Sequence, residues 1–152
     1  MLLAWITLLI CSMSFALSFA HLMELSARMS WSQDLWVQTT VTGGLYRMFE
    51  MPGALIAMGA VLLSAILAFV RRSTSEAAWC IAGAVLFAVG LAVWFAFVAP
   101  MNKHLAEWRS TGVVTNFGAV RAQWEYAHAT IAVLLFAGLA SLTRAALLMP
   151  RV

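Results

Sequence analysis

Four long stretches of the chain are almost wholly apolar, and polar segments separate them. A helix that crosses the hydrocarbon core of a bilayer needs about 20 predominantly apolar residues. The pattern predicts membrane helices over residues 1–28, 45–70, 77–99 and 118–149. Pro100 should end the third helix, because proline is disfavoured in a helix interior. We therefore expect one transmembrane domain, residues 1–152, with an all-α fold: an integral membrane four-helix bundle.

The composition agrees with a bilayer, not water, as the solvent of this chain. Of its 152 residues, 64% are hydrophobic and 10% are charged. Soluble domains average about 45–50% apolar and about 25% charged residues. The net charge is +3, but the basic residues are scattered, and no basic run is longer than Arg71-Arg72. The expected partner is therefore the lipid bilayer and not a nucleic acid.

An even number of spans places both termini on one side of the membrane. That side carries Arg71, Arg72, Arg144 and Arg151. Because cytoplasmic loops are enriched in Lys and Arg, the compact Arg71-Arg72 pair favours termini in the cytoplasm. We expect the membrane to be a bacterial inner membrane.

The side away from the termini collects most of the titratable side chains. It holds all three histidines and five of the six acidic residues: His21, His104, His128, Glu24, Asp34, Glu50, Glu107 and Glu125. The long connections on this side also carry Trp31, Trp36 and Trp108, which we expect to be anchors at the membrane interface. Chemistry is therefore expected at this face.

Two short polar motifs, on the first and fourth predicted helices, mirror each other. The first is His21-x-x-Glu24, on a weakly polar helix face that should turn into the bundle. The second is Glu125-x-x-His128, and Arg121 stands four residues before Glu125, where it can pair with it. Antiparallel neighbouring helices would bring the two motifs together. Ionisable residues at membrane depth are costly, which favours a functional role.

Paired histidines on facing helices are typical of axial haem ligands. We expect His21 and His128 to bind a b-type haem (heme b). Trp108 and Trp124 would wall the pocket. Arg121 could bind a haem propionate, since its guanidinium suits bidentate contact with a carboxylate.

Other uses of the same residues remain open. A non-haem iron or copper site is one, because Glu125-x-x-His128 with Glu24 and Glu50 forms part of a carboxylate-bridged metal set. A second use is catalysis without a cofactor, in which a desolvated His or Glu takes a proton from an acidic substrate. In a third, His21 and His128 only hydrogen-bond the facing carboxylates and lock the bundle.

A stripe of small residues follows one face of the second predicted helix. Its members are Gly53, Ala57, Ala60 and Ser64. Small residues let helix backbones approach closely, either within one chain or in a homodimer.

A family resemblance rests on three segments of the chain. They are His21-Leu-Met-Glu24-Leu-Ser-Ala-Arg28, Pro100-Met-Asn102 with Trp108, and Arg121-x-x-Trp124-Glu125-x-x-His128. Together they resemble the anthrone oxygenase-like family of small four-helix membrane proteins. The resemblance implies the same fold, a hydrophobic or aromatic substrate, and oxidation without an added cofactor. It also implies one constellation made of His21, Glu24, Asn102, Trp108, Arg121, Trp124, Glu125 and His128.

The residues and their placement predict a haem-binding redox protein or oxidoreductase of the membrane. The alternative is a cofactor-free or non-haem-metal oxygenase. A small-molecule transporter or a structural membrane subunit is a further alternative. A transporter needs a polar path to both faces, and the second and third predicted helices are nearly apolar throughout, which counts against a wide pore.

Overall fold

The computed structural model describes residues 1–42 and 47–150, with side chains from residue 52 onward in the second range. The elements are α1 (Leu2–Ser30), α2 (Gln33–Val37), the π-helical turn η1 (Gln38–Thr42), α3 (Arg47–Val70), α4 (Ala77–Val93), the π-helical turn η2 (Trp94–Val98), α5 (Ala99–Thr111) and α6 (Phe117–Leu148). The predicted all-α four-helix bundle is confirmed for these residues.

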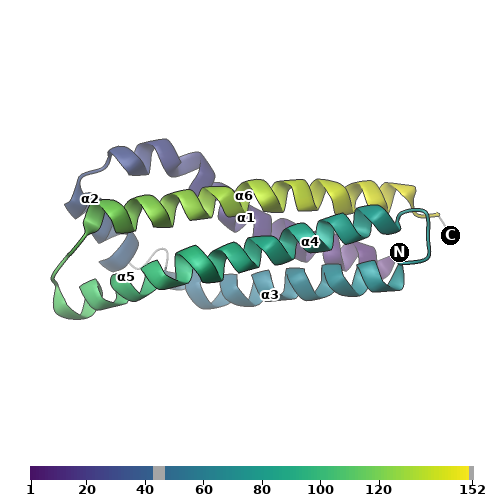
Figure 1. The fold of residues 1–152 in the computed structure, drawn as a ribbon, viewed down its shortest axis with the longest axis horizontal. Helices are drawn as coiled ribbons and strands as arrows, with labels where there is room; N and C mark the ends of the chain where they lie inside the picture. Colours follow the sequence, from purple (N-terminus) through teal and green to yellow (C-terminus); the bar gives the residue numbers. More distant parts are fainter. Residues whose placement is uncertain (43–46, 151–152) are drawn as a thin grey trace.

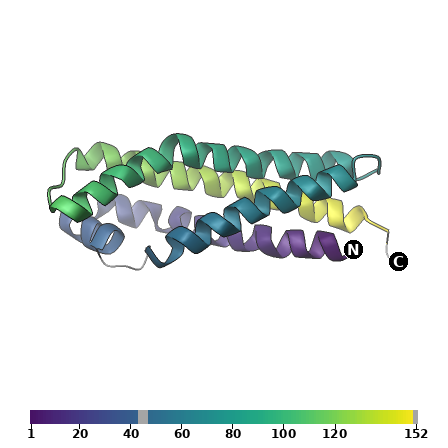
Figure 2. The ribbon, with the colours of Figure 1, turned by 90° about the horizontal axis from the view of Figure 1, so that it is seen from below.

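The long helices form a ring of four. Both α1 and α4 contact α3 and α6, so α1 and α4 lie at diagonal corners. Figures 1 and 2 show that α1 begins and α6 ends at the same end of the bundle. The first and last helices are therefore antiparallel neighbours, the arrangement that the mirrored His and Glu motifs require.

The third long helix does not end at Pro100, in contrast to the expectation from the sequence. The backbone N–H of Ala99 donates to the carbonyl of Trp94, five residues earlier, which is the bonding of a π-helical turn. Pro100 then stands at the start of α5, where its missing N–H costs little. The helical rod therefore continues through η2 and α5 as far as Thr111.

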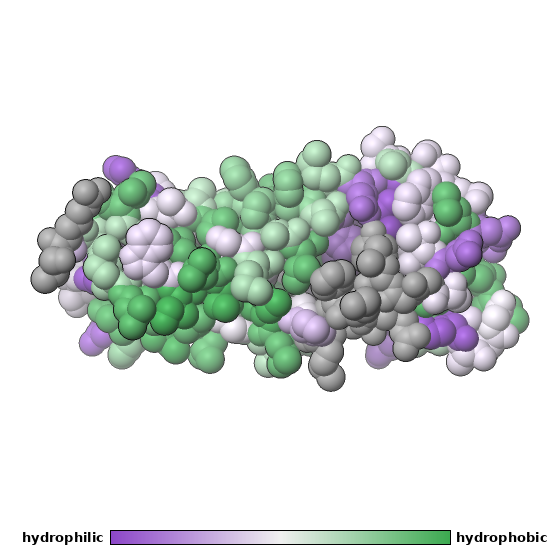
Figure 3. Space-filling view, turned by 180° about the vertical axis from the view of Figure 1, so that it is seen from behind, coloured by the Kyte–Doolittle hydropathy of each residue, from purple (hydrophilic) through white to green (hydrophobic). Residues whose placement is uncertain are grey.

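The outer surface of the bundle is apolar along most of its length. Large hydrophobic side chains such as Leu9, Leu55, Phe69 and Phe136 are exposed. Figure 3 shows hydrophobic residues over most of one face and hydrophilic ones gathered near one end. Within the described residues, four helices are long and apolar enough to cross a membrane. The chain is therefore an integral membrane protein whose exposed apolar side chains contact lipid.

The helices are longer than a bilayer requires. Helix α6 has 32 residues. At 1.5 Å per residue this is about 48 Å, whereas the hydrocarbon core is about 30 Å thick. The excess lies opposite the termini, where α2, η1 and α5 surround the start of α6 (Figure 1). We call the last turn of α1, together with α2, η1, α5 and the first three turns of α6, the polar end.

The small-residue stripe of α3 serves packing within the chain. Ala60 and Ser64 are fully buried, and the Cys11 thiol on α1 donates a hydrogen bond to the Ala60 carbonyl at 3.8 Å. A methyl group added at Gly53 would meet Leu17 at an ordinary contact distance of 3.7 Å. At Gly53 and Ala60, the small residues therefore face α1 and let the two helices approach closely.

Helices α4 and α6 approach even more closely at two glycines. A Cβ atom at Gly83 would lie 2.5 Å from Leu142 Cγ, and one at Gly138 would lie 2.9 Å from Phe87 Cδ2. No real Cβ tolerates such distances, so larger residues would force the helices apart.

We predict that Gly138→Ala destabilises the protein by about 1–3 kcal/mol, the usual cost of overpacking. The matched control is Gly118→Ala, because a Cβ there meets nothing within 4 Å. The free energy of unfolding of both variants can be measured in detergent micelles. A Gly138→Ala protein as stable as the Gly118→Ala protein would contradict the close approach of α4 and α6.

The link between α3 and α4 holds a buried carboxylate. Glu76 is 1% exposed, its Oε1 lies 3.3 Å from Arg71 Nη1, and its Oε2 accepts a hydrogen bond from Ser75 at 3.1 Å. Burial alone raises the pKa of Glu76, but hydrogen bonds from its own backbone amide, from Ser75 and from Thr74, together with the charge of Arg71, outweigh burial and lower that pKa.

A lowered pKa in the folded state means that ionised Glu76 stabilises the fold above its unfolded pKa of about 4.3. This contribution is lost as the pH falls through the lower folded pKa. We expect the stability advantage of the parent protein over Glu76→Gln to shrink when detergent-solubilised samples are unfolded at pH 3 instead of pH 6. A stability difference between the parent protein and Glu76→Gln that is the same at both pH values would contradict the prediction.

Candidate functional site

A buried ion pair lies at the centre of the polar end. Arg28 on α1 and Glu125 on α6 are both 0% exposed, and Arg28 Nε donates to Glu125 Oε1 at 2.7 Å. Arg28 Nη2 donates to Thr40 Oγ1 at 2.7 Å. The Trp36 indole N–H donates to the same Glu125 oxygen at 2.6 Å. The pair therefore joins α1, α2, η1 and α6 at one point.

Aromatic rings take the place of water around the guanidinium. Arg28 Cζ lies 5.2 Å from the ring centroid of Trp31, 5.7 Å from that of Trp36 and 5.6 Å from that of Trp124. Cation–π attraction is strongest over tryptophan and increases when the cation is desolvated. Three indoles thus offset part of the cost of removing this charge from water.

The expected pairing of Arg121 with Glu125 is wrong. Arg121 Nη1 donates instead to the Trp31 carbonyl at 2.8 Å, and its guanidinium lies 4.7 Å from the Phe117 ring centroid. The partner of Glu125 comes from the neighbouring helix because α1 and α6 pack closely, and Arg28 reaches across their interface. Arg121, one turn before Glu125, ties the end of α1 to α6.

Two tryptophans expected at the membrane interface are core residues. Trp36 is 0% exposed and Trp108 is 3% exposed. Trp36 is buried because its N–H has a carboxylate partner in Glu125. Trp108 packs at 6.4 Å, centroid to centroid, from Phe117, which also contacts Trp36 at 5.8 Å. The polar end thus has its own aromatic core.

The two histidines of the mirrored motifs are in contact. The ring centroids of His21 and His128 lie 4.4 Å apart, with an interplanar angle of 36°. His128 Nδ1 lies 2.8 Å from the Trp124 carbonyl oxygen. A carbonyl only accepts hydrogen bonds, so Nδ1 carries the proton, and in the neutral ring Nε2 has the free lone pair. His128 is thereby held as a base or ligand through Nε2.

Trp124 connects the histidines to α5. Its ring centroid lies 4.1 Å from that of His128 and 5.0 Å from that of His21. Its indole N–H donates to Asn102 Oδ1 at 2.9 Å. Asn102 thus fixes the orientation of the indole ring that contacts both imidazoles. We call His21, His128, Trp124 and Asn102 the histidine cluster.

The remaining predicted residues lie at the margins of this arrangement. Glu24 is half exposed, with Oε2 at 3.8 Å from Arg28 Nη1. His104 is exposed beside Glu107, at 4.0 Å, and has no place in the histidine cluster. The side chain of Glu50 lies outside the described residues.

The positions of the two imidazoles do not suit the metal sites predicted from the sequence. In the described part of the chain, no group of three or more His, Cys, Asp or Glu side chains could hold a metal ion. Metal–nitrogen bonds of about 2.0–2.1 Å place two imidazoles on opposite sides of a haem iron about 6 Å apart, centroid to centroid. At 4.4 Å, the rings of His21 and His128 are too close for this arrangement and would have to separate.

The sequence did not predict that Arg28, Trp36 and Thr40 surround Glu125. Arg28 had the clearest signal, since it continues the helix face of His21 and Glu24 and belongs to the motif that resembles the family. Trp36 was expected at the interface. Thr40 had no signal, because its part depends on η1 folding back over the bundle.

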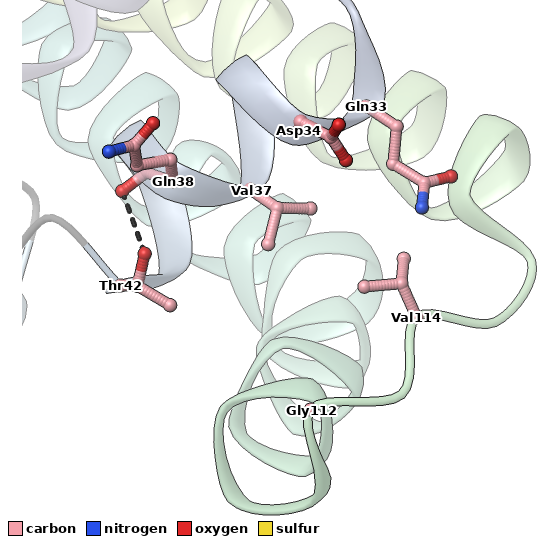
Figure 4. A pocket seen from close by; sticks show the side chains of 7 residues that line it. All are labelled: Gln33, Asp34, Val37, Gln38, Thr42, Gly112 and Val114. Carbon is pink, nitrogen blue, oxygen red and sulfur yellow. Dashed lines mark hydrogen bonds between the residues drawn. The ribbon is translucent and has the colours of Figure 1, made fainter.

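A separate cavity opens at the water-facing side of the polar end. It has a volume of about 440 Å³ and lies between α2, η1 and the link from α5 to α6. Its lining is mostly polar: Gln33 and Asp34 lie side by side, and Gln38 accepts a hydrogen bond from Thr42 on the other side of the cavity (Figure 4). It contains none of the residues predicted for the site, so the histidine cluster is a distinct feature.

Comparison with known proteins gave no assignment: no family model, no curated protein and no solved structure matches the chain.

We predict that Glu125→Ala destabilises the protein by about 3–5 kcal/mol, because Arg28 is then a buried charge without its counter-ion. Arg28→Ala should cost a similar amount. The double variant should lose clearly less than the sum, because both charges are gone. Unfolding titrations in detergent micelles measure the free energy of unfolding of the two single variants and the double variant.

Glu24→Ala is the matched control for this cycle. Its carboxylate also faces Arg28, but it is half exposed, so its loss should cost about 0–1 kcal/mol. If the stability losses of the two single variants add up to the loss of the double variant, Arg28 and Glu125 are not a coupled buried pair.

Proposed function

We propose that this protein is a membrane oxygenase that needs no bound cofactor and uses its histidine pair as a base on a small, hydrophobic, aromatic substrate. The observation that carries the proposal is the contact of His21 with His128 at 4.4 Å, with His128 Nδ1 bonded to a backbone carbonyl. This arrangement supports proton abstraction by Nε2.

The surroundings of the histidine cluster suit an apolar substrate. Both imidazoles are partly exposed, although α1 and α6 are membrane helices. At 1.5 Å per residue, His128 lies about 24 Å along α6 from Arg144 at the other end of the bundle, and therefore near the edge of the hydrocarbon core. A compound dissolved in the bilayer can reach this depth, where the two partly exposed imidazoles lie.

The buried ion pair supports the same chemistry by holding the helices without adding net charge. Glu125 compensates the positive charge of Arg28. The imidazoles therefore face a neutral pair. Their positions relative to each other are set by Arg28, seven residues after His21, and by Glu125, three residues before His128.

The reaction that fits is oxidation of an acidic CH₂ group between two aryl rings, as in an anthrone. His128 Nε2 takes one proton, and the carbanion gives its electrons to dioxygen. Overall, CH₂ and O₂ become C=O and H₂O, so the four electrons lost by carbon reduce dioxygen and no other co-reactant is needed. The resemblance to the anthrone oxygenase-like family supports this substrate class.

Haem b is the second candidate, and one observation favours it. A histidine whose Nδ1–H donates to a carbonyl is oriented as metal-bound histidines are. Binding of both rings to one haem iron would require them to move apart. A Soret band in the purified protein that both His21→Ala and His128→Ala abolish would favour this candidate over the cofactor-free one.

Further expectations from the sequence belong to this proposal. The termini would lie in the cytoplasm of a bacterium, on the basis of Arg71-Arg72. A homodimer would have to use surfaces other than the buried part of the α3 stripe, because Ala60 and Ser64 already pack within the chain.

We predict that His128→Ala and His21→Ala each lower the rate of anthrone-dependent oxygen consumption by at least about 100-fold, the usual contribution of a general base. The matched control is His104→Ala, an exposed histidine at the same membrane face. Helical content by circular dichroism should be unchanged in all three. If His104→Ala matched the other two variants, or if none of them slowed the reaction, the proposed base would be refuted.

A further inference from the structure

A groove runs along the outside of the bundle between α1 and α6, at the end that holds the termini. Its volume is about 370 Å³. Phe15 on α1 and Phe136 on α6 pack against each other at 5.8 Å, centroid to centroid, at one part of the groove. Leu139 and Leu147 continue the apolar lining.

The groove lies on the membrane-facing surface. Phe136 is 61% exposed and Leu147 is 71% exposed, and both stand on a helix that can span the bilayer. Lipid therefore surrounds the groove, and an apolar furrow of this kind is complementary to an acyl chain.

A cation marks one end of the groove. Arg144 lines it, together with the hydroxyl-bearing Thr143. Arg144 is eight residues after Phe136, so the two lie about 12 Å apart along α6. A positive charge at a membrane boundary needs an anion or water close by.

No described acidic side chain pairs with this arginine. The ion pairs in the described part of the chain do not include Arg144. Five of the six acidic residues belong to the other side of the membrane, and the sixth, Glu76, contacts Arg71. In the described part of the chain Arg144 therefore has no carboxylate partner, which leaves its guanidinium available to an anion from the surrounding lipid.

We propose that this groove binds one anionic phospholipid, with its phosphate on Arg144 and one acyl chain along Phe136, Phe15 and Leu139. The planar guanidinium forms paired hydrogen bonds to phosphate, and the Thr143 hydroxyl is a further donor beside it. The positive charge of Arg144 at the membrane boundary favours an anionic headgroup over a zwitterionic one. This site is independent of the histidine cluster.

Native mass spectrometry of the full chain released from nanodiscs tests the proposal. The nanodiscs contain phosphatidylglycerol and phosphatidylcholine in equal amounts. We expect one retained phosphatidylglycerol per chain, and we expect Arg144→Gln to weaken its retention about tenfold, the effect of losing one charge-assisted contact. Retention of phosphatidylcholine should not change.

Two further variants make the test specific. Arg72→Gln removes an equal charge at the same end, but Arg72 packs on Phe69 outside the groove, so retention should stay at the parent level. Ala140→Trp fills the groove without a change in charge and should lower retention as Arg144→Gln does. Equal losses in Arg72→Gln and Arg144→Gln, or full retention in Arg144→Gln, would overturn the proposal.

Discussion

The ion pair between Arg28 and Glu125 is the interaction on which the polar end depends. Both side chains are completely buried, and the bond of 2.7 Å joins the first and last helices of the chain. Removing two charges from water is expensive and is offset only when further hydrogen bonds and good geometry accompany the pair. Thr40, Trp36 and three indole faces provide that compensation. The segment from α2 to η1 is therefore held over the bundle by polar contacts.

The same pair explains why two histidines from opposite ends of the sequence meet. Arg28 follows His21 by two helical turns, and Glu125 precedes His128 by one. Once the charged residues are joined, the register between α1 and α6 is fixed, and the imidazoles come to lie 4.4 Å apart. Asn102 and Trp124 then set the orientation of the rings. Stability and the proposed chemistry thus share one structural cause.

The sequence was informative where helical periodicity decides the outcome. The apolar stretches predicted the bundle, and the mirrored motifs predicted that His21 and His128 would meet if α1 and α6 were antiparallel neighbours, as they are. The partner of Glu125 was wrongly predicted, because Arg121 and Arg28 both satisfy the helix spacing and only the packing of α1 on α6 distinguishes them. The burial of Trp36 and the passage of the helix through Pro100 depend on a folded-back connection and on a π-helical turn, which local sequence patterns do not specify.

The most direct test is to measure whether the two imidazoles are in contact and whether that contact depends on the ion pair. The chain has three histidines, so a His104→Gln background with isotopically labelled histidine leaves only the pair of interest. Solid-state NMR of this protein in lipid bilayers should show cross-peaks between the rings of His21 and His128. Introducing Arg28→Met into the same background should abolish them. Absence of cross-peaks in the background protein, or cross-peaks that persist unchanged after Arg28→Met, would contradict the account.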